Sequence, residues 1–474
     1  MISIRHLYGP IAILAVVGVA LYSEALTSTI QPRPDALTKA GAALFPSAVP
    51  HPEGGPGRVH VTYWEKWTDF EGDAMRRVVD EFNRSQSRIW VDLLTVSDID
   101  EKVLVATSGG IPPDVAGLFG PNVPDYADDN AVISMDAYCG KYGIRREQYI
   151  PAFWDIGYYH KHVFALPSTP ASVALHWNKT IFAKGAKRLR AAGLDPGQPP
   201  RTLEDLIRYA DALTIKDENG KIIQAGFLPA EPGWWNWVWG YWYGGNLWDG
   251  SSKITANSPE NIRGFEFVQS FSKKYGPQQV ETFRSGFGNF SSPQNAFMSG
   301  KVAMELQGVW MYNFITKFAP ELKWGVAPFP YPQNRPDLKD MTIADEDVLC
   351  IPVGARHPDE AFEFIRFVQS QHVMELLNML QRKFTPLKKV SLEFWKNHPN
   401  PYIRLFQQLT LGKNVVATPQ TGIWNEYQSE LNNCFDNVSL DRATPQQALQ
   451  DVQDRIQPEL DRYLLRLHAR EAHP

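Results

Sequence analysis

Residues 58–96 read RVHVTYWEKWTDFEGDAMRRVVDEFNRSQSRIWVDLLTV, and this stretch predicts a strand, a helix and a second strand. Apolar and polar side chains alternate over residues 58–64, as in a strand with one buried face. Apolar residues then recur at helical spacing from Met75 to Phe82 and form one stripe. Residues 88–96 follow as the next strand.

The same alternation continues along the chain. Residues 100–108 predict a helix that is stopped by Gly109-Gly110, and residues 114–119 predict a third strand. Repeated strand and helix predict an α/β fold, with a mostly parallel sheet covered by helices. The chain of 474 residues exceeds the ~250–300 residues that one core serves, so we expect two lobes. Near the end, residues 446–467 predict a helix that Pro458 breaks or kinks.

Composition excludes some partners and leaves others open. Hydrophobic residues make up 43% of the chain and charged residues 21%, which is an ordinary globular composition. The net charge is −5 and no run of Lys or Arg occurs, so nucleic acid is not expected as a partner. Cys350 lies in an apolar strand and reads as an inert core thiol. A bridge between Cys139 and Cys434 stays open.

The first 26 residues resemble an export signal. One Arg precedes an apolar run over residues 11–21, and Ser23-Glu24-Ala25 would suit cleavage. Residues 1–26 are therefore predicted to be a signal peptide or, if uncleaved, an N-terminal membrane anchor. Residues 27–57 are rich in Pro and Gly and predict a linker. Either outcome places the rest of the chain in the periplasm or another extracytoplasmic space, anchored to the inner membrane if the leader is retained.

Several segments carry a family resemblance. Besides residues 61–96, the motifs in order are SGGIPPDVAGL (108–118), VFALPSTPASVALHWNKTIFAKG (163–185), AAGLDPGQPPRTLEDLIRYADALT (191–214), AFMSGKVAMELQGVWMYNF (296–314) and IPVGARHPDEAFEFIRFVQS (351–370). Together they resemble the extracellular (family 1) solute-binding proteins of ABC importers, in the carbohydrate-binding group typified by maltose-binding protein.

The resemblance implies a two-lobe periplasmic-binding-protein fold, type II-like, with a hinge and an interlobe ligand cleft. It assigns residues 58–168 and 329–370 to the N-terminal lobe, and residues 169–328 and 371–474 to the C-terminal lobe. The implied function is capture of a carbohydrate or polyol and its delivery to ABC permease subunits. We accordingly expect a monomeric binding protein rather than an enzyme, without cofactor or metal. His160-Lys161-His162 gains no third metal ligand from the sequence.

The resemblance also suggests ligand contacts. Trp310 and Trp424 match tryptophans that stack on sugar in the relatives, and Glu231 stands where a Glu-Pro pair contacts ligand. A sugar has apolar C–H faces and polar edges, so aromatic rings beside carboxylates suit it. Trp64 and Trp67 follow the first strand, whose carboxyl end should face the cleft. Each of these residues could instead be a core residue.

Residues 234–243 read WWNWVWGYWY, the most aromatic stretch of the chain. The family places a helix here, and a helix that is aromatic all round must be buried on most sides. We expect Trp234 and Trp235 to reach the cleft beside Glu231. The remaining tryptophans of the run, Trp237, Trp239 and Trp242, are expected in the core.

The segment IADEDVLCIPV departs from the family pattern, because Asp345, Glu346 and Asp347 replace small residues. Asp345 and Glu346 are predicted ligand contacts, as part of an acidic wall for hydroxyls or a cationic group. A solvated loop is the alternative. Two other functions stay open: a membrane-anchored ligand sensor, and a glycoside-active enzyme that would use two carboxyl groups.

Overall fold

The computed structural model describes residues 57–289 and 291–472. The predicted leader, and the linker apart from Gly57, lie outside the described residues. Within the described part, no helix combines the length and the apolar character needed to cross a membrane. Cys139, Cys350 and Cys434 are all buried and free, so the bridge that the sequence left open is not formed.

The opening stretch folds as its pattern predicts. Strand β1 (Val59–Glu65), helix α3 (Asp69–Ser85) and strand β2 (Ile89–Thr95) follow in order, and the predicted apolar stripe of α3 is buried. After helix α4 (Ile99–Ser108), strand β3 (Val115–Phe119) pairs with β1. Both β2 and β3 run parallel to β1, as strands joined by helical crossovers do.

Beyond these three strands, the prediction of a mostly parallel sheet is wrong. The long strand β6 (Leu166–Asn178) runs antiparallel to β11 (Thr342–Cys350), and β11 runs antiparallel to β3. Farther along, β6 pairs antiparallel with β9 (Met304–Gly308) and β10 (Trp324–Ala327). The sheet order is β10-β6-β11-β3-β1-β2, and β9 and β12 pair with β6 and β11 off this path.

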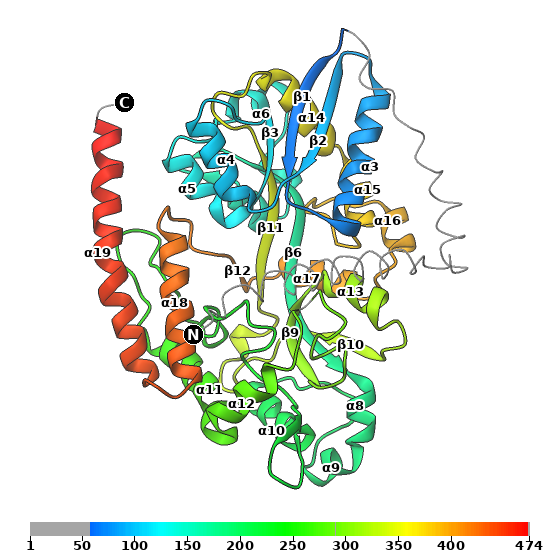
Figure 1. The fold of residues 1–474 in the computed structure, drawn as a ribbon, viewed down its shortest axis with the longest axis vertical. Coiled ribbons are helices and arrows are strands. Elements are labelled where there is room, and N and C mark those ends of the chain that lie inside the picture. The colour runs from blue at the N-terminus through cyan, green and yellow to red at the C-terminus, as the bar shows by residue number, and fades with distance from the viewer. Residues whose placement is uncertain (1–56, 290, 473–474) are drawn as a thin grey trace, which may run out of the picture. The chain divides into compact units, whose positions relative to one another are not determined.

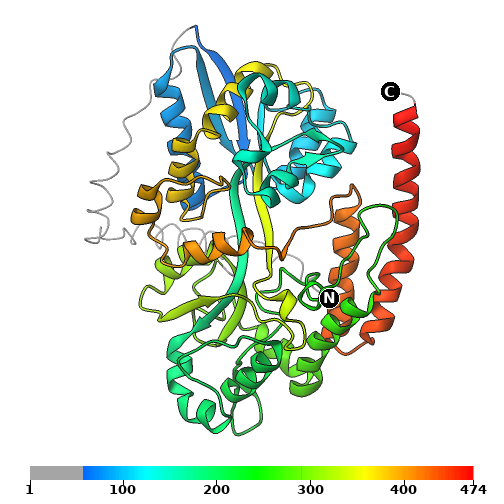
Figure 2. The ribbon, with the colours of Figure 1, turned by 180° about the vertical axis from the view of Figure 1, so that it is seen from behind.

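Two large cores flank these long strands. One surrounds β1, α3, α14 (Pro358–Val368) and α15 (Gln371–Leu380). The other includes α10 (Leu203–Leu213), α11 (Pro259–Tyr275), α18 (Trp424–Ser439) and the aromatic run, at the opposite end of β6 (Figure 1). Figure 2 shows the continuous passage of β6 and β11 from one end to the other. The lobe boundaries given by the resemblance stay a prediction.

The remaining elements complete the order of the chain. The helices are α5 (Val123–Asp128), α6 (Asp136–Tyr142), α7 (Pro151–Ile156), α8 (Lys179–Lys184), α9 (Ala186–Ala191), α10 (Leu203–Leu213), α11 (Pro259–Tyr275), α12 (Pro277–Arg284), α13 (Met311–Phe318), α16 (Leu392–Asn397), α17 (Ile403–Thr410), α18 (Trp424–Ser439) and α19 (Pro445–Ala472). Short strands are β4 (Tyr158–Tyr159), β5 (His162–Val163), β7 (Ile215–Lys216), β8 (Ile222–Gln224) and β12 (Val415–Val416). Helix α19 continues through Pro458, so Pro458 does not end the helix, and the alternative of a kink stays a prediction.

The aromatic run is not the predicted helix. It forms successive turns with hydrogen bonds between residues three apart, such as Val238 N–H to Trp235 O, and ends in the 3-10 helix η3 (Tyr241–Tyr243). Gly240 permits these turns to pack closely, because a side-chain carbon there would lie 1.8 Å from the Asn261 amide oxygen. Trp237, Trp239 and Trp242 are buried as predicted, although on turns rather than on a helix.

Candidate functional site

Three half-buried tryptophans lie together and form what we call the tryptophan platform: Trp234, Trp235 and Trp310. The ring centres of Trp234 and Trp235 are 6.4 Å apart and nearly parallel, at 15°. Trp310 lies 5.2 Å from Trp234 and 6.2 Å from Trp235. The sequence predicted all three as ligand contacts, and the fold brings them together from positions about 75 residues apart in the chain.

The position of Trp310 depends on the strand before it. Trp310 follows β9, and its ring folds back over Gly308, where a side-chain carbon would come within 2.2 Å of the indole. Any residue other than glycine at 308 would therefore displace the ring. The indole N–H of Trp310 is buried and has no hydrogen-bond partner among the described residues. The Trp310 indole N–H is thus a hydrogen-bond donor without a described partner, next to the partly exposed rings of the platform.

Glu231 begins the segment that leads into the platform. Its carboxylate accepts a hydrogen bond from Arg284 Nε at 2.8 Å, and the Glu231 side chain is 10% exposed. Arg284 also pairs with Glu281 at 2.9 Å. Burial raises the pKa of Glu231, and the Arg284 guanidinium offsets part of that rise. Glu231 therefore stands at the platform as a partly buried carboxylate held by one arginine.

Glu305 is a second carboxyl group in this region, which the sequence reasoning missed. It lies on β9 and is fully buried, and neither carboxyl oxygen has a partner among the described residues. Burial, and then the nearby charge of Glu231, raise the pKa of Glu305 to about 8. At neutral pH this side chain is therefore mostly protonated and can donate as well as accept. A single Glu within the apolar stretch VAMELQG was the available clue.

Trp424 lies in the core next to the platform. It begins α18, is 2% exposed, and packs edge-on against Trp237 at 5.1 Å. Trp237 in turn contacts Trp235 at 6.2 Å, so an unbroken series of rings joins Trp424 to the platform. The indole N–H of Trp424 also has no partner among the residues that the structure describes. A ligand-binding role for Trp424 stays a prediction.

Trp64 and Trp67 lie at the end of β1, on different faces. Trp67 is 6% exposed and belongs to the core around α3, with Lys66 Nζ 5.0 Å and Lys383 Nζ 5.7 Å from its ring centre. Trp64 is half-buried against another apolar cluster, which includes Val348. Trp310 of the platform packs against the same cluster as Trp64, whereas Trp67 belongs to a separate core. Contact of Trp64 or Trp67 with ligand stays a prediction.

The acidic segment is part of β11, so the alternative of a solvated loop is wrong. The Asp347 carboxylate forms an ion pair with Lys66, with Nζ 2.9 Å from Oδ1, and its Oδ2 lies 3.8 Å from Lys383 Nζ. Burial alone would raise the pKa of Asp347, but these two ammonium groups lower it below its usual value. The Lys66–Asp347 ion pair thus joins the end of β1 to β11 across the intervening strand β3.

Asp345 and Glu346 differ from Asp347 because neither pairs with a cation within 4.0 Å among the described residues. Burial and the charge of Asp347 raise the pKa of Asp345 to about 7. Glu346 is 3% exposed, its carboxyl oxygens have no described partner, and burial raises its pKa well above the usual value. Asp345 can therefore be protonated and donate a hydrogen bond near neutral pH. Contact of Asp345 and Glu346 with ligand stays a prediction.

Residues 69–375 match the family of bacterial extracellular solute-binding proteins. The chain belongs to this family. The predicted resemblance is therefore confirmed. The sn-glycerol-3-phosphate-binding periplasmic protein UgpB of Escherichia coli K12 is 26% identical over 222 residues, which are 44% of this chain and 45% of that protein. Its counterpart in Pectobacterium atrosepticum is 20% identical over 435 residues, or 85% of this chain and 91% of its own.

Solved structures agree on the fold. CpMnBP1 with mannotriose bound is 26% identical to this family member, with a TM-score of 0.72 over 84% of this chain and 99% of its own. The sugar-binding protein MalE from Xanthomonas citri is 19% identical, with a TM-score of 0.68 over 86% and 99% of the two chains. The two-lobe periplasmic-binding-protein fold predicted for this family member is confirmed.

Proposed function

We propose that this family member is an extracytoplasmic binding protein that captures a sugar or oligosaccharide between its lobes and delivers it to ABC permease subunits. The tryptophan platform carries the proposal. Its stacked, half-buried rings supply apolar faces for sugar C–H groups. Glu231, at the start of the same segment, supplies a carboxylate that can hydrogen-bond sugar hydroxyl groups. The platform joins segments that the resemblance matched to sugar contacts.

The proposed contacts extend beyond the platform. Trp424 continues the ring series, while Asp345 and Glu346 supply carboxyl groups on β11. Trp64 and Trp67 stand at the end of β1. We propose these five as further contacts in a ligand-bound form, in which a hinge movement would bring the lobes together, a change common in periplasmic binding proteins.

A glycerol phosphate ligand is the competing possibility that the UgpB relatives raise. A phosphate group needs cations or unpaired backbone donors. Beside the platform, Arg284 is the described cation that contacts Glu231, and both of its bonds go to carboxylates. Glu231 and Glu305 add acidic groups in the same region. The Glu231 carboxylate, and the pairing of Arg284 with two carboxylates, favour a carbohydrate over a phosphate ester at this site.

The remaining features of the proposal rest on the family. The relatives named above are binding proteins, which supports a function without catalysis. Their periplasmic names support an extracytoplasmic location. A monomer, and attachment to the membrane through an uncleaved leader, belong to the proposal as well.

Titration calorimetry tests the proposal. The purified protein is titrated with mannotriose, maltotriose and sn-glycerol-3-phosphate, and the Trp310→Ala variant is titrated with whichever sugar binds. We expect a saturable signal with at least one neutral oligosaccharide and none with the phosphate ester. Binding of glycerol phosphate alone would overturn carbohydrate specificity. New reducing ends released at enzyme-like rates would overturn the non-catalytic function.

A further inference from the structure

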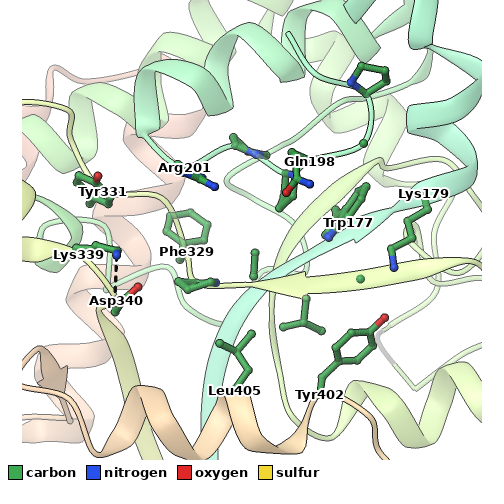
Figure 3. Close-up of a pocket in the computed structure, with 18 residues that line it drawn as sticks. Trp177, Lys179, Gln198, Arg201, Phe329, Tyr331, Lys339, Asp340, Tyr402 and Leu405 are labelled. Carbon is green, nitrogen blue, oxygen red and sulfur yellow. Dashed lines mark ion pairs between the residues drawn. The ribbon is translucent and has the colours of Figure 1, made fainter.

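A large cavity lies away from the tryptophan platform. It has a volume of about 970 Å³ and is bounded by three segments: strand β10, the proline-rich loop of residues 196–201, and the start of α17. Figure 3 shows the side chains that line it. We call it the edge-strand groove. Its volume lies at the upper end of the ~300–1,000 Å³ usual for ligand sites, but its floor is a strand rather than a closed pocket.

The floor of the groove is an open strand edge. β10 stands at the end of the sheet order, with β6 as its partner. Lys179 N–H donates to Lys323 O at 2.8 Å, so by the antiparallel alternation Gly325 and Ala327 also bond to β6. The main-chain groups of Trp324 and Val326 therefore point away from β6.

One of these outward groups is already used, and the others face the groove. Tyr402 on α17 donates its hydroxyl to Trp324 O at 2.8 Å, which confirms the outward direction of that carbonyl. Among the described residues, no group bonds to the amide or the carbonyl of Val326. Val326 is half-buried and lines the groove. It thus presents one donor and one acceptor in the spacing that a further strand requires.

Cations border this edge. Lys179, Arg201 and Lys339 line the groove, against a single carboxylate, Asp340, which lies 3.9 Å from Lys339 Nζ. Among the described residues, no carboxylate lies within 4.0 Å of Lys179 Nζ or the Arg201 guanidinium. In the view of Figure 3, Gln198 and Trp177 lie between Arg201 and Lys179. The positive charges are therefore spread along the groove rather than gathered at one point, which suits an extended anion.

The walls supply apolar contacts for side chains. Trp177 lies flat across β10, because Gly325 has no side chain: a carbon there would be 2.4 Å from the indole nitrogen. Phe329 and Tyr331 continue the wall on one side, and Leu405 lies on the other. Rings and prolines beside an open strand edge provide shallow pockets for the alternate side chains of an added strand.

We propose that the edge-strand groove binds an extended acidic segment of a partner protein, which adds to β10 as a further strand. The Val326 amide and carbonyl pair with the main chain of that segment, while Lys179 and Arg201 pair with its carboxylates. The separation of the cations favours an extended chain over a small anion, and the open main-chain groups favour a peptide over an acidic sugar. This site is independent of the proposed sugar site.

Fluorescence anisotropy tests the proposal with a labelled octapeptide of alternating Glu and Val, and with a Lys-Val octapeptide as the charge control. Val326→Pro removes the outward N–H without breaking a bond to β6, and proline is tolerated on edge strands. Val326→Ala is the matched control, because it keeps the amide and shortens the side chain. A double variant, Lys179→Glu with Arg201→Glu, reverses the charge.

We expect the acidic peptide to bind at least tenfold more tightly than the basic one. Val326→Pro and the charge-reversed variant should each weaken binding about tenfold or more, while Val326→Ala changes it less than threefold. All variants should keep the wild-type melting temperature within a few degrees and the wild-type affinity for sugar. Lack of saturable binding would overturn the proposal and would assign the lysines to protection of the edge against aggregation. Equal binding by both Val326 variants, or binding of trigalacturonate instead of the peptide, would overturn it too.

Discussion

The two halves of the aromatic run use the same residue type in opposite surroundings. Trp234 and Trp235 are half-buried and meet Trp310, whereas Trp237, Trp239 and Trp242 are 1–2% exposed among aliphatic and aromatic neighbours. Trp242, for example, packs against Phe329 at 4.5 Å. Density of tryptophan alone therefore does not mark a binding site. The platform differs from the core in that its rings have an open face with polar groups beside it.

The largest effect should come from the core half. Trp239→Ala removes a ring that contacts Phe227 and Phe267, and it leaves a large cavity. We expect a loss of about 3–5 kcal/mol in the free energy of unfolding, measured by urea denaturation. Trp235→Ala is the control, because its half-buried ring should cost roughly half as much or less. Equal losses in the two variants would remove the distinction between the halves.

The contrast also shows what the sequence can predict. The periodic stripe of α3 and the alternation of β1 gave correct elements, because one buried face imposes a repeat on the residues themselves. Burial of Trp237, Trp239 and Trp242 followed for the same reason, since side chains of that size rarely stay in water. The family and the two-lobe fold followed from ordered motifs.

The errors arose where tertiary contacts decide the outcome. The aromatic run forms turns in which Gly240 packs closely against Asn261 of helix α11, a contact that no local pattern contains. The acidic segment lies inside β11 because Lys66 and Lys383, distant in sequence, compensate Asp347. Glu305 went unnoticed because its significance comes from burial and from the proximity of Glu231, neither of which spacing reveals.

Trp424 combines features of the core half and of the platform. Its ring is buried against Trp237, yet it stands one ring away from the platform series. Trp424→Ala should therefore lower the free energy of unfolding by about 3 kcal/mol. If its proposed ligand contact is correct, sugar affinity should also fall by about 1–3 kcal/mol. Loss of stability with unchanged calorimetric affinity would assign Trp424 to the core alone.

Trp310→Ala should lower sugar affinity more than it lowers stability. The variant removes a half-buried platform ring, so we expect sugar affinity to fall by about 1–3 kcal/mol, that is, roughly fivefold to more than a hundredfold. The free energy of unfolding should change by about 1 kcal/mol or less. Trp310→Phe keeps an aromatic face and should retain most of the affinity. Wild-type affinity in the alanine variant, measured by the same calorimetric titration, would contradict the assignment of the platform to the ligand.

Per pH unit, Glu305 gives the smallest expected change in energy, and it tests whether the buried acid beside Glu231 remains protonated. Its pKa rises from about 4.5 unfolded to about 8 folded, so between these values the folded chain holds a proton that the unfolded chain has lost. The contribution of Glu305 to stability therefore falls as pH rises through this window, by up to about 1.4 kcal/mol per pH unit. Glu305→Gln cannot ionise and should lack that part of the slope.

Urea denaturation of wild type and Glu305→Gln at pH 5, 6, 7 and 8 measures the difference. Other buried acids, such as Asp345, titrate in both proteins, so their contributions cancel in the comparison. The stability advantage of the glutamine variant should grow with pH and level off above pH 8. Parallel pH profiles would mean that Glu305 is ionised and paired in the folded protein, and the platform would then adjoin a fixed negative charge rather than a neutral donor.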